Sequence, residues 1–160
     1  MDKLNIICVD DQREVLSTIS KDLQVFEKFV SLEECESADE ALNVLNEIEA
    51  ESDYAAVIIS DHIMPGKNGV EFLIEVNNDD RFNATKKMLL TGQATHKDTI
   101  EAINKANIDN YIEKPWNAEK LVQIVKVLLT EFVISKGIDY QKYIPILDQQ
   151  TLLENLSKQV

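Results

Sequence analysis

Short apolar runs alternate with helical patterns along most of the chain. Residues 4–9 and 55–59 are nearly continuous apolar runs rich in β-branched side chains, which is typical of strands buried on both faces of a parallel sheet. Residues 28–35, 86–91 and 109–114 read as three further strands that are shorter or less regular. The pattern therefore predicts five strands.

Helical patterns with start signals lie between these strands. Ser37 and Glu40 form an S-x-x-E capping box before apolar residues at helical spacing, namely Ala41, Leu42, Leu45 and Ile48. Asn117 can cap a long final helix that ends near Gly137, with an apolar stripe of Leu121, Ile124, Val125, Leu128 and Phe132. Strand and helix alternate about five times. This order predicts an α/β fold with a doubly wound, five-stranded parallel sheet.

The composition favours one globular domain and argues against two classes of partner. A chain of 160 residues, 44% of them hydrophobic, is long enough for an ordinary core. A formal net charge of −13 repels phosphate backbones, so no direct nucleic-acid binding is expected. No apolar run is long enough to span a bilayer and no leader pattern is present, so no membrane association is expected. Cys8 and Cys35 lack metal-ligand spacing and indicate reduced thiols in a cytoplasmic protein.

Polar and charged residues stand where four of the predicted strands end. The first strand is followed by Asp10 and Asp11, the third by Asp61, the fourth ends in Thr91, and the fifth leads to Lys114. Singly, each residue has an ordinary explanation as a turn former, a helix cap or a solvated side chain. The carboxyl ends of parallel strands share one edge, however, and ligands bind there. The shared location therefore favours a site.

The chemistry of these residues favours a phosphoryl group and a metal ion. Clustered carboxylates repel one another unless a cation joins them, and Mg²⁺ prefers oxygen ligands. A lysine beside the acids can pair with a phosphoryl oxygen, and a threonine hydroxyl can donate a hydrogen bond to another. Together these groups suit phosphoryl transfer to a carboxylate, with Mg²⁺ and lysine balancing the charge.

Four motifs carry a resemblance to a known family. They are VDD at 9–11, SDHIMPGKNG at 60–69, LLTG at 89–92 and YIEKP at 111–115. With them the sequence resembles the receiver domain of two-component response regulators, of the kind found in chemotaxis regulators, over about residues 2–130. The resemblance implies a flavodoxin-like fold with sheet order 2-1-3-4-5. It also implies phosphoryl transfer from a histidine kinase or a phosphotransfer protein.

The resemblance assigns roles to the acidic residues. Asp61 falls on the phosphoacceptor position. Asp10 and Asp11 fall on the acid pair that binds Mg²⁺, with Asp11 as a direct ligand and Asp10 acting mostly through water. The backbone carbonyl of Ile63 would supply a further ligand.

The resemblance also identifies the residues that respond to phosphorylation. Thr91 falls on the switch hydroxyl, Lys114 on the phosphate-pairing lysine and Tyr111 on the rotating switch aromatic residue. Pro115 falls where the family has a cis peptide bond. The responding surface would comprise the fourth helix, the fifth strand and the fifth helix.

Two positions near the phosphoacceptor bear on the lifetime of the phosphorylated form. Ile63 and Gln93 lie two residues beyond Asp61 and Thr91, where a side chain can hold the water that attacks phosphorus. Ile63 has no hydrogen-bonding group, and Gln93 can orient water but cannot act as a base. We therefore expect slow intrinsic dephosphorylation, over minutes or longer.

The resemblance divides the chain into a receiver of residues 1–130 and a C-terminal extension of residues 131–160. The extension continues the final helix and then becomes a short amphipathic helical tail or a linker, with apolar residues Ile144, Ile146, Leu147, Leu152, Leu153 and Leu156. Two interpretations stay open. The tail either packs on the receiver or serves as a linker, or it is an element for dimerisation or partner docking.

The leading hypothesis is a phosphorylation-controlled switch that is not a turnover enzyme. Its partners would be a histidine kinase or phosphotransfer protein, a downstream protein target or output domain and, in one version, a second copy of the chain. A phosphohydrolase with an aspartyl-phosphate intermediate would need a D-x-D motif, which SDHI lacks. Two alternatives are a receiver that regulates an enzymatic output domain outside this chain, and a constitutive interaction module. A constitutive interaction module would be expected to lack one of the acidic residues or the lysine of the site.

Overall fold

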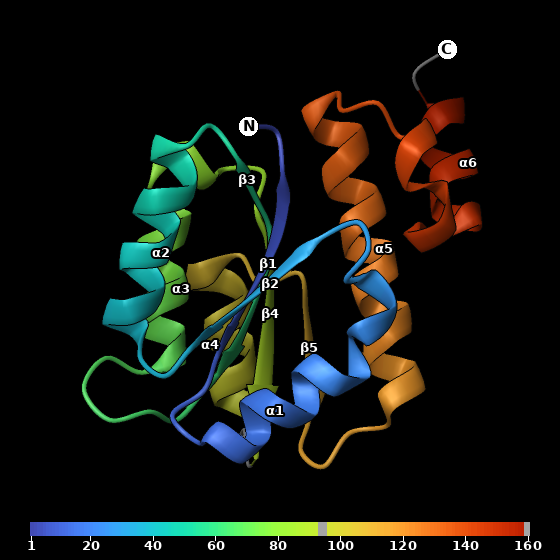
Figure 1. The fold of residues 1–160 in the computed structure, drawn as a ribbon. Helices are drawn as coiled ribbons and strands as arrows, with labels where there is room; N and C mark the ends of the chain where they lie inside the picture. Colours follow the sequence, from blue (N-terminus) through green and yellow to red (C-terminus); the bar gives the residue numbers. More distant parts are fainter. Residues whose placement is uncertain (93–95, 159–160) are drawn as a thin grey trace.

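Five parallel strands form the centre of the computed structural model, which describes residues 1–92 and 96–158 (Figure 1). The strands are β1 (Leu4–Val9), β2 (Ser31–Cys35), β3 (Tyr54–Asp61), β4 (Lys86–Thr91) and β5 (Asn110–Glu113). Their order in the sheet is β2-β1-β3-β4-β5. This confirms the predicted doubly wound fold and the flavodoxin-like order.

The central strands are the most apolar ones, as the sequence pattern predicts. All six residues of β1 are buried, and so are seven of the eight residues of β3. β2 lies at one edge of the sheet and is only partly buried. The predicted strand 28–35 begins too early, because the backbone N–H groups of Phe29 and Val30 donate to the Phe26 carbonyl in a turn. Pairing with β1 therefore begins at Ser31.

Helices cover both faces of the sheet. α1 (Arg13–Asp22) and α5 (Ala118–Lys136) lie on one face, and α2 (Ala38–Ala50), α3 (Gly69–Asn77) and α4 (His96–Ala106) lie on the other (Figure 1). Each face has its own cluster of buried apolar side chains. Two short 3₁₀ turns, Gln24–Phe26 and Asp80–Phe82, follow α1 and α3 and bury a phenylalanine each.

Side-chain caps set the ends of several helices. The Ser37 hydroxyl accepts a hydrogen bond from the Glu40 backbone N–H at 3.1 Å, and the Glu40 carboxylate accepts one from the Glu36 backbone N–H at 2.9 Å. The predicted capping box therefore forms, shifted by one residue on its return bond. Asn117 caps α5 through the Lys120 backbone N–H, and Gly137 ends α5 with a φ of 71°.

The chain continues beyond α5 as a helical tail. It consists of a 3₁₀ segment, Gln141–Ile146, and α6 (Gln149–Ser157), which lie beside the C-terminal half of α5 (Figure 1). Tyr143, Ile146 and Leu147 join the apolar cluster on the α1/α5 face of the sheet. Within the part of the chain that the structure describes, no helix has both the length and the apolar composition needed to cross a bilayer.

Candidate functional site

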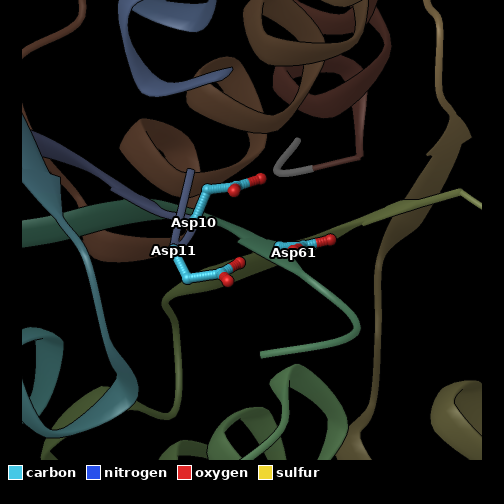
Figure 2. A group of neighbouring side chains, drawn as sticks. All are labelled: Asp10, Asp11 and Asp61. Atoms are coloured by element: carbon cyan, nitrogen blue, oxygen red, sulfur yellow. The ribbon is translucent and has the colours of Figure 1, made fainter. Parts of the chain in front are cut away.

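Three carboxylates meet at the carboxyl edge of the sheet. Asp10 and Asp11 follow β1, and Asp61 is the last residue of β3. β1 and β3 are neighbours, and Val9 pairs with Ser60, so the residues that follow each come side by side. Carboxylate oxygens of the three residues all lie within 4.8 Å of one another. Figure 2 shows the three side chains as neighbours at the two strand ends.

Lys114 joins the two buried acids. Its Nζ donates hydrogen bonds to Asp10 Oδ2 and to Asp61 Oδ1, both at 2.9 Å. It follows β5, and its backbone N–H donates to the Thr91 carbonyl at 2.8 Å. The peptide bond between Lys114 and Pro115 is cis. The ammonium therefore stands between carboxylates that come from two different strands.

Burial and neighbouring charges shift the pKa values of Asp61 and Lys114. Burial raises the pKa of Asp61, and the nearby Asp10 charge raises it further, while the Lys114 hydrogen bond only partly offsets the rise. Burial opposes the charge of Lys114 as well, but its hydrogen bonds to Asp10 and Asp61 outweigh this and raise the pKa of Lys114. The site carries more acidic than basic groups, so an added cation would relieve the repulsion between the acids.

The donor set suits a hard divalent cation such as Mg²⁺. Asp10 is fully buried, and its Oδ1 is held by the Gln12 backbone N–H at 2.8 Å. Asp11 is exposed to solvent, whereas Asp61 is buried. The carboxylate groups are therefore fixed on one side and open to water on the other. Mg²⁺ prefers such a site, because it takes one or two carboxylates and keeps several waters.

Thr91 contributes a buried hydroxyl group at the end of β4. The residue ends β4, one position beyond Leu90, which pairs with Asp61. Its Oγ1 is buried and has no hydrogen-bond partner among the described residues. A buried polar group left unpaired costs about 1–3 kcal/mol.

The remaining predicted residues lie around the acid cluster. Tyr111 on β5 is 41% exposed, and Ile63 in the loop after β3 is 72% exposed. Both side chains therefore reach solvent. Gln93 lies outside the described residues.

The loop between β3 and α3 holds Asp61 in place through a close backbone approach. The Gly69 backbone N–H donates to the His62 carbonyl at 2.8 Å, and a Cβ added to Gly69 would overlap the backbone oxygen of Asp61. Gly66 has a φ of 78°, which favours glycine. Asn68 caps α3 by accepting from the Glu71 backbone N–H at 2.9 Å. Gly69 thus permits the close approach to Asp61, whereas Gly66 permits the turn of the loop.

Sequence reasoning missed a contact that anchors the loop carrying Lys114. The Trp116 indole N–H donates to Asp22 Oδ2 at 2.8 Å, and Trp116 packs against the core. Asp22 is the last residue of α1, where a negative charge opposes the helix dipole. The unfavourable charge at the end of α1 and the single tryptophan of the sequence are the two signals that could have pointed to the contact.

The two cysteines add no reactive thiol to this site. Cys8 and Cys35 are free and buried. Burial raises the pKa of Cys8 far above its ordinary value and that of Cys35 to about 12. Both thiols are therefore protonated and unreactive at neutral pH.

Comparison with known proteins gives a consistent family assignment. The family model described as response regulator receiver domain matches residues 6–126. The hydrogenase transcriptional regulatory protein HoxA of Cupriavidus necator is 33% identical over 121 residues, which is 76% of this chain and 23% of the length of HoxA. Chemotaxis protein CheY1 of Helicobacter pylori is 26% identical over 130 residues, 79% of this chain and 97% of CheY1.

Solved structures agree on the fold. The signal receiver domain of an HD domain-containing protein from Pseudomonas fluorescens Pf-5 superposes with a TM-score of 0.71 at 25% identity, covering 81% of this chain and 97% of that one. Vibrio cholerae CheY4 superposes with a TM-score of 0.67 at 24% identity, covering 79% and 99%. The family model covers well over half of the 160 residues. The chain therefore belongs to the response regulator receiver domain family.

Proposed function

We propose that this protein is a two-component switch that accepts a phosphoryl group on Asp61 from a histidine kinase or phosphotransfer protein. The observation that carries the proposal is the Lys114 ammonium held at 2.9 Å from both Asp10 and Asp61, beside a third carboxylate. Asp61 attacks the phosphorus of a phosphohistidine. The new P–O bond forms as the P–N bond breaks, and the leaving imidazole keeps the electron pair and takes up a proton.

Each nearby residue has a defined task in this step. Asp11 would hold Mg²⁺ directly and Asp10 through water, with the Ile63 carbonyl as a further ligand. When bound, Mg²⁺ supplies positive charge against the phosphoryl oxygens. Lys114 can exchange one carboxylate contact for a phosphoryl oxygen, since its Nζ already stands between the acids. The unpaired Thr91 hydroxyl donates to another phosphoryl oxygen.

The switch would be read on the surface of α4, β5 and α5. Movement of Thr91 towards the phosphoryl group leaves space for Tyr111, which is 41% exposed here, to rotate inwards. Tyr111 also lines a groove of about 700 Å³ along β5 and the start of α5, with Trp116, Lys120 and Ile124. A downstream partner can read the position of Tyr111 in this groove. The phosphoryl group ends on the protein itself, so the chain is not a turnover enzyme.

A second candidate function is the control of an output domain that is joined to the receiver in one longer chain. It is supported by the HoxA relatives, because the chain spans only 23% of the length of one and 17% of the other. In that arrangement the same surface would contact the output domain instead of a separate protein. A constitutive interaction module is less well supported, because the acids and the lysine of the site are all present and in contact.

Labelling with a small phosphodonor and Mg²⁺ tests the proposal. The wild-type protein should form an acid-stable, base-labile acyl phosphate, and Asp61→Asn should abolish it. Lys114→Ala should retain some label but uncouple it from the switch, because the acceptor stays while a charge partner is lost. Asp53→Asn is a matched control, since Asp53 precedes β3 at its other end. Label retained at the same site in Asp61→Asn would refute the assignment.

A further inference from the structure

α5 has buried side chains on two opposite sides. One side packs against the sheet, with Leu121, Val125, Leu128, Leu129 and Phe132 all buried. Successive residues of a helix are rotated by about 100°, which places Thr130 on the side opposite to this stripe. Thr130 is nevertheless 0% exposed. Val127 and Ile134 share its side of the helix. The burial of Thr130 and the partial burial of Val127 and Ile134 mean that this outer face of α5 is covered as well.

The tail supplies that cover through buried apolar side chains. Tyr143, Ile146, Leu147 and Leu152 are all buried, although they lie beyond the helix that completes the receiver. Ile134 and Leu156 line a common pocket at the turn between α5 and the tail. Two tail residues, Ile144 and Leu153, remain exposed on the outside. α6 is thus amphipathic, with its apolar side turned to α5.

Asp148 ties the start of α6 to α5 by a set of hydrogen bonds. Its backbone N–H donates to Thr130 Oγ1 at 2.8 Å, and Thr130 Oγ1 donates to the Lys126 carbonyl at 2.7 Å. Gln123 Nε2 donates to Asp148 Oδ1 at 2.9 Å. The other carboxylate oxygen caps α6 by accepting from the Thr151 backbone N–H at 3.0 Å. One residue therefore begins α6 and positions it on the outer face of α5.

We infer that residues 141–157 are a built-in cover for the outer face of α5, which keeps this face from pairing with a second copy of the chain. The occupant is the chain's own tail, because the apolar side chains and hydrogen bonds of the two elements already match in one molecule. Without the tail, α5 would expose the apolar side chains of Val127 and Ile134, with the Thr130 hydroxyl between them. Exposed apolar patches of this kind are rare on monomers and readily self-associate about a twofold axis.

The cover also limits where a partner can bind. The family model ends at residue 126, so residues 141–157 lie outside the part of the chain that it matches. With the outer face of α5 closed, the groove beside Tyr111, Lys120 and Ile124 is left for the partner of the proposed switch. This last consequence rests on the proposed function. The cover itself does not, and the test below needs no phosphorylation.

A pair of neighbouring leucines in the full chain provides the test. Leu152 is 8% exposed and Leu153 is 67% exposed, and both lie in α6. Leu152→Asp places a charge against α5 and should release the tail, so that α6 amides lose their protection from hydrogen exchange. Light scattering should then give about a twofold higher mass as the opened α5 faces pair. Leu153→Asp, the matched control, should keep both the protection and the monomer mass.

A milder variant guards against general unfolding. Thr130→Val keeps the shape of the side chain but leaves the Asp148 N–H without its acceptor, so α6 amides should exchange roughly tenfold faster. Amides of β1 and β3 should exchange as in the wild type. Thr18→Val is the control, because Thr18 makes the same kind of bond to the carbonyl four residues earlier but lies on the exposed side of α1.

The inference is overturned if the α6 amides of the wild-type protein are unprotected, or if Leu152→Asp and Leu153→Asp behave alike. It is also overturned if the wild-type protein is a dimer that Leu153→Asp dissociates, since the outer side of α6 would then be the interface.

Discussion

The Lys114 ammonium group partly compensates the repulsion between two buried carboxylates. Asp10 and Asp61 are both buried, and their charges oppose each other. Lys114 neutralises part of this repulsion with two hydrogen bonds of 2.9 Å. Burial still raises the pKa of Asp61, so the cluster keeps an affinity for a further positive charge. Because the compensation is incomplete, the site can bind a further cation beside Lys114.

Ile63 is expected to control how long the phosphoryl group stays on Asp61. The side chain is 72% exposed, so Ile63→Asn should not disturb the core. The amide can hold an attacking water where isoleucine cannot, and such positioning is worth about 1–3 kcal/mol, or roughly 5- to 150-fold in rate. Loss of label in the presence of Mg²⁺ should therefore be faster in Ile63→Asn than in the wild type.

Val25→Asn is the control for Ile63→Asn, because Val25 is 51% exposed and lies in the turn after α1. It should leave the rate of label loss unchanged. Equal rates for Ile63→Asn and the wild type would show that isoleucine only fills space in the loop.

At the level of elements, the junction of β3 and α3 depends on one missing side chain. A methyl group at Gly69 would overlap the backbone of Asp61, the residue that ends β3. Alanine favours a helix over glycine by about 1 kcal/mol, whereas forcing an atom into a packed site costs about 1–3 kcal/mol. The steric cost should win, because the obstacle is backbone and not a flexible side chain.

Gly69→Ala should therefore lower the free energy of unfolding in urea by up to about 2 kcal/mol, the difference between these two effects. It should also slow phosphorylation, since Asp61 must shift to make room. Gly92→Ala is the matched control for stability, because an added Cβ there has no heavy atom within 4 Å. A Gly69→Ala protein as stable and as active as the wild type would contradict the argument.

At the level of the whole molecule, we expect one buried lysine to reduce stability. Lys87 on β4 is 1% exposed, and its Nζ donates to the Thr85 carbonyl at 3.2 Å. Burial lowers the pKa of Lys87, and the nearby Asp109 only partly offsets this. Below its folded-state pKa the lysine is charged in both states, so the cost of burying the charge is paid in full. As the pH rises from there to the ordinary lysine pKa, the cost fades.

Lys87→Met should thus raise the free energy of unfolding at neutral pH by about 1–3 kcal/mol. Its advantage over the wild type should shrink as the pH rises towards the ordinary pKa of lysine. Lys86→Met is the control, because Lys86 lies near Asp109 and Glu131 on the half-exposed side of the same strand and should give no gain. A Lys87→Met protein that is less stable at neutral pH would mean that the ammonium is better compensated than its contacts indicate.

The C-terminal tail packs on α5 in the folded molecule. Its amphipathic pattern left a packed tail, a linker and a docking element open. In the structure its apolar side chains lie against α5, and Thr130 and Asp148 join the two helices. α5 itself carried the missing signal, since a helix with apolar residues on opposite sides requires two partners.

The sequence by itself determined the elements and the family. Apolar runs such as 4–9 predicted the strands, Ser37 and Asn117 predicted helix starts, and four motifs predicted the receiver fold, because each of these signals lies within a few neighbouring residues. Only the tertiary structure decided which groups touch. The contacts of Lys114 with Asp10 and Asp61 span 104 and 53 residues of sequence, and no local pattern encodes such distances. The same holds for the start of β2 at Ser31 and for the bond between Thr130 and Asp148, which depend on how strands and helices pack once the core has formed.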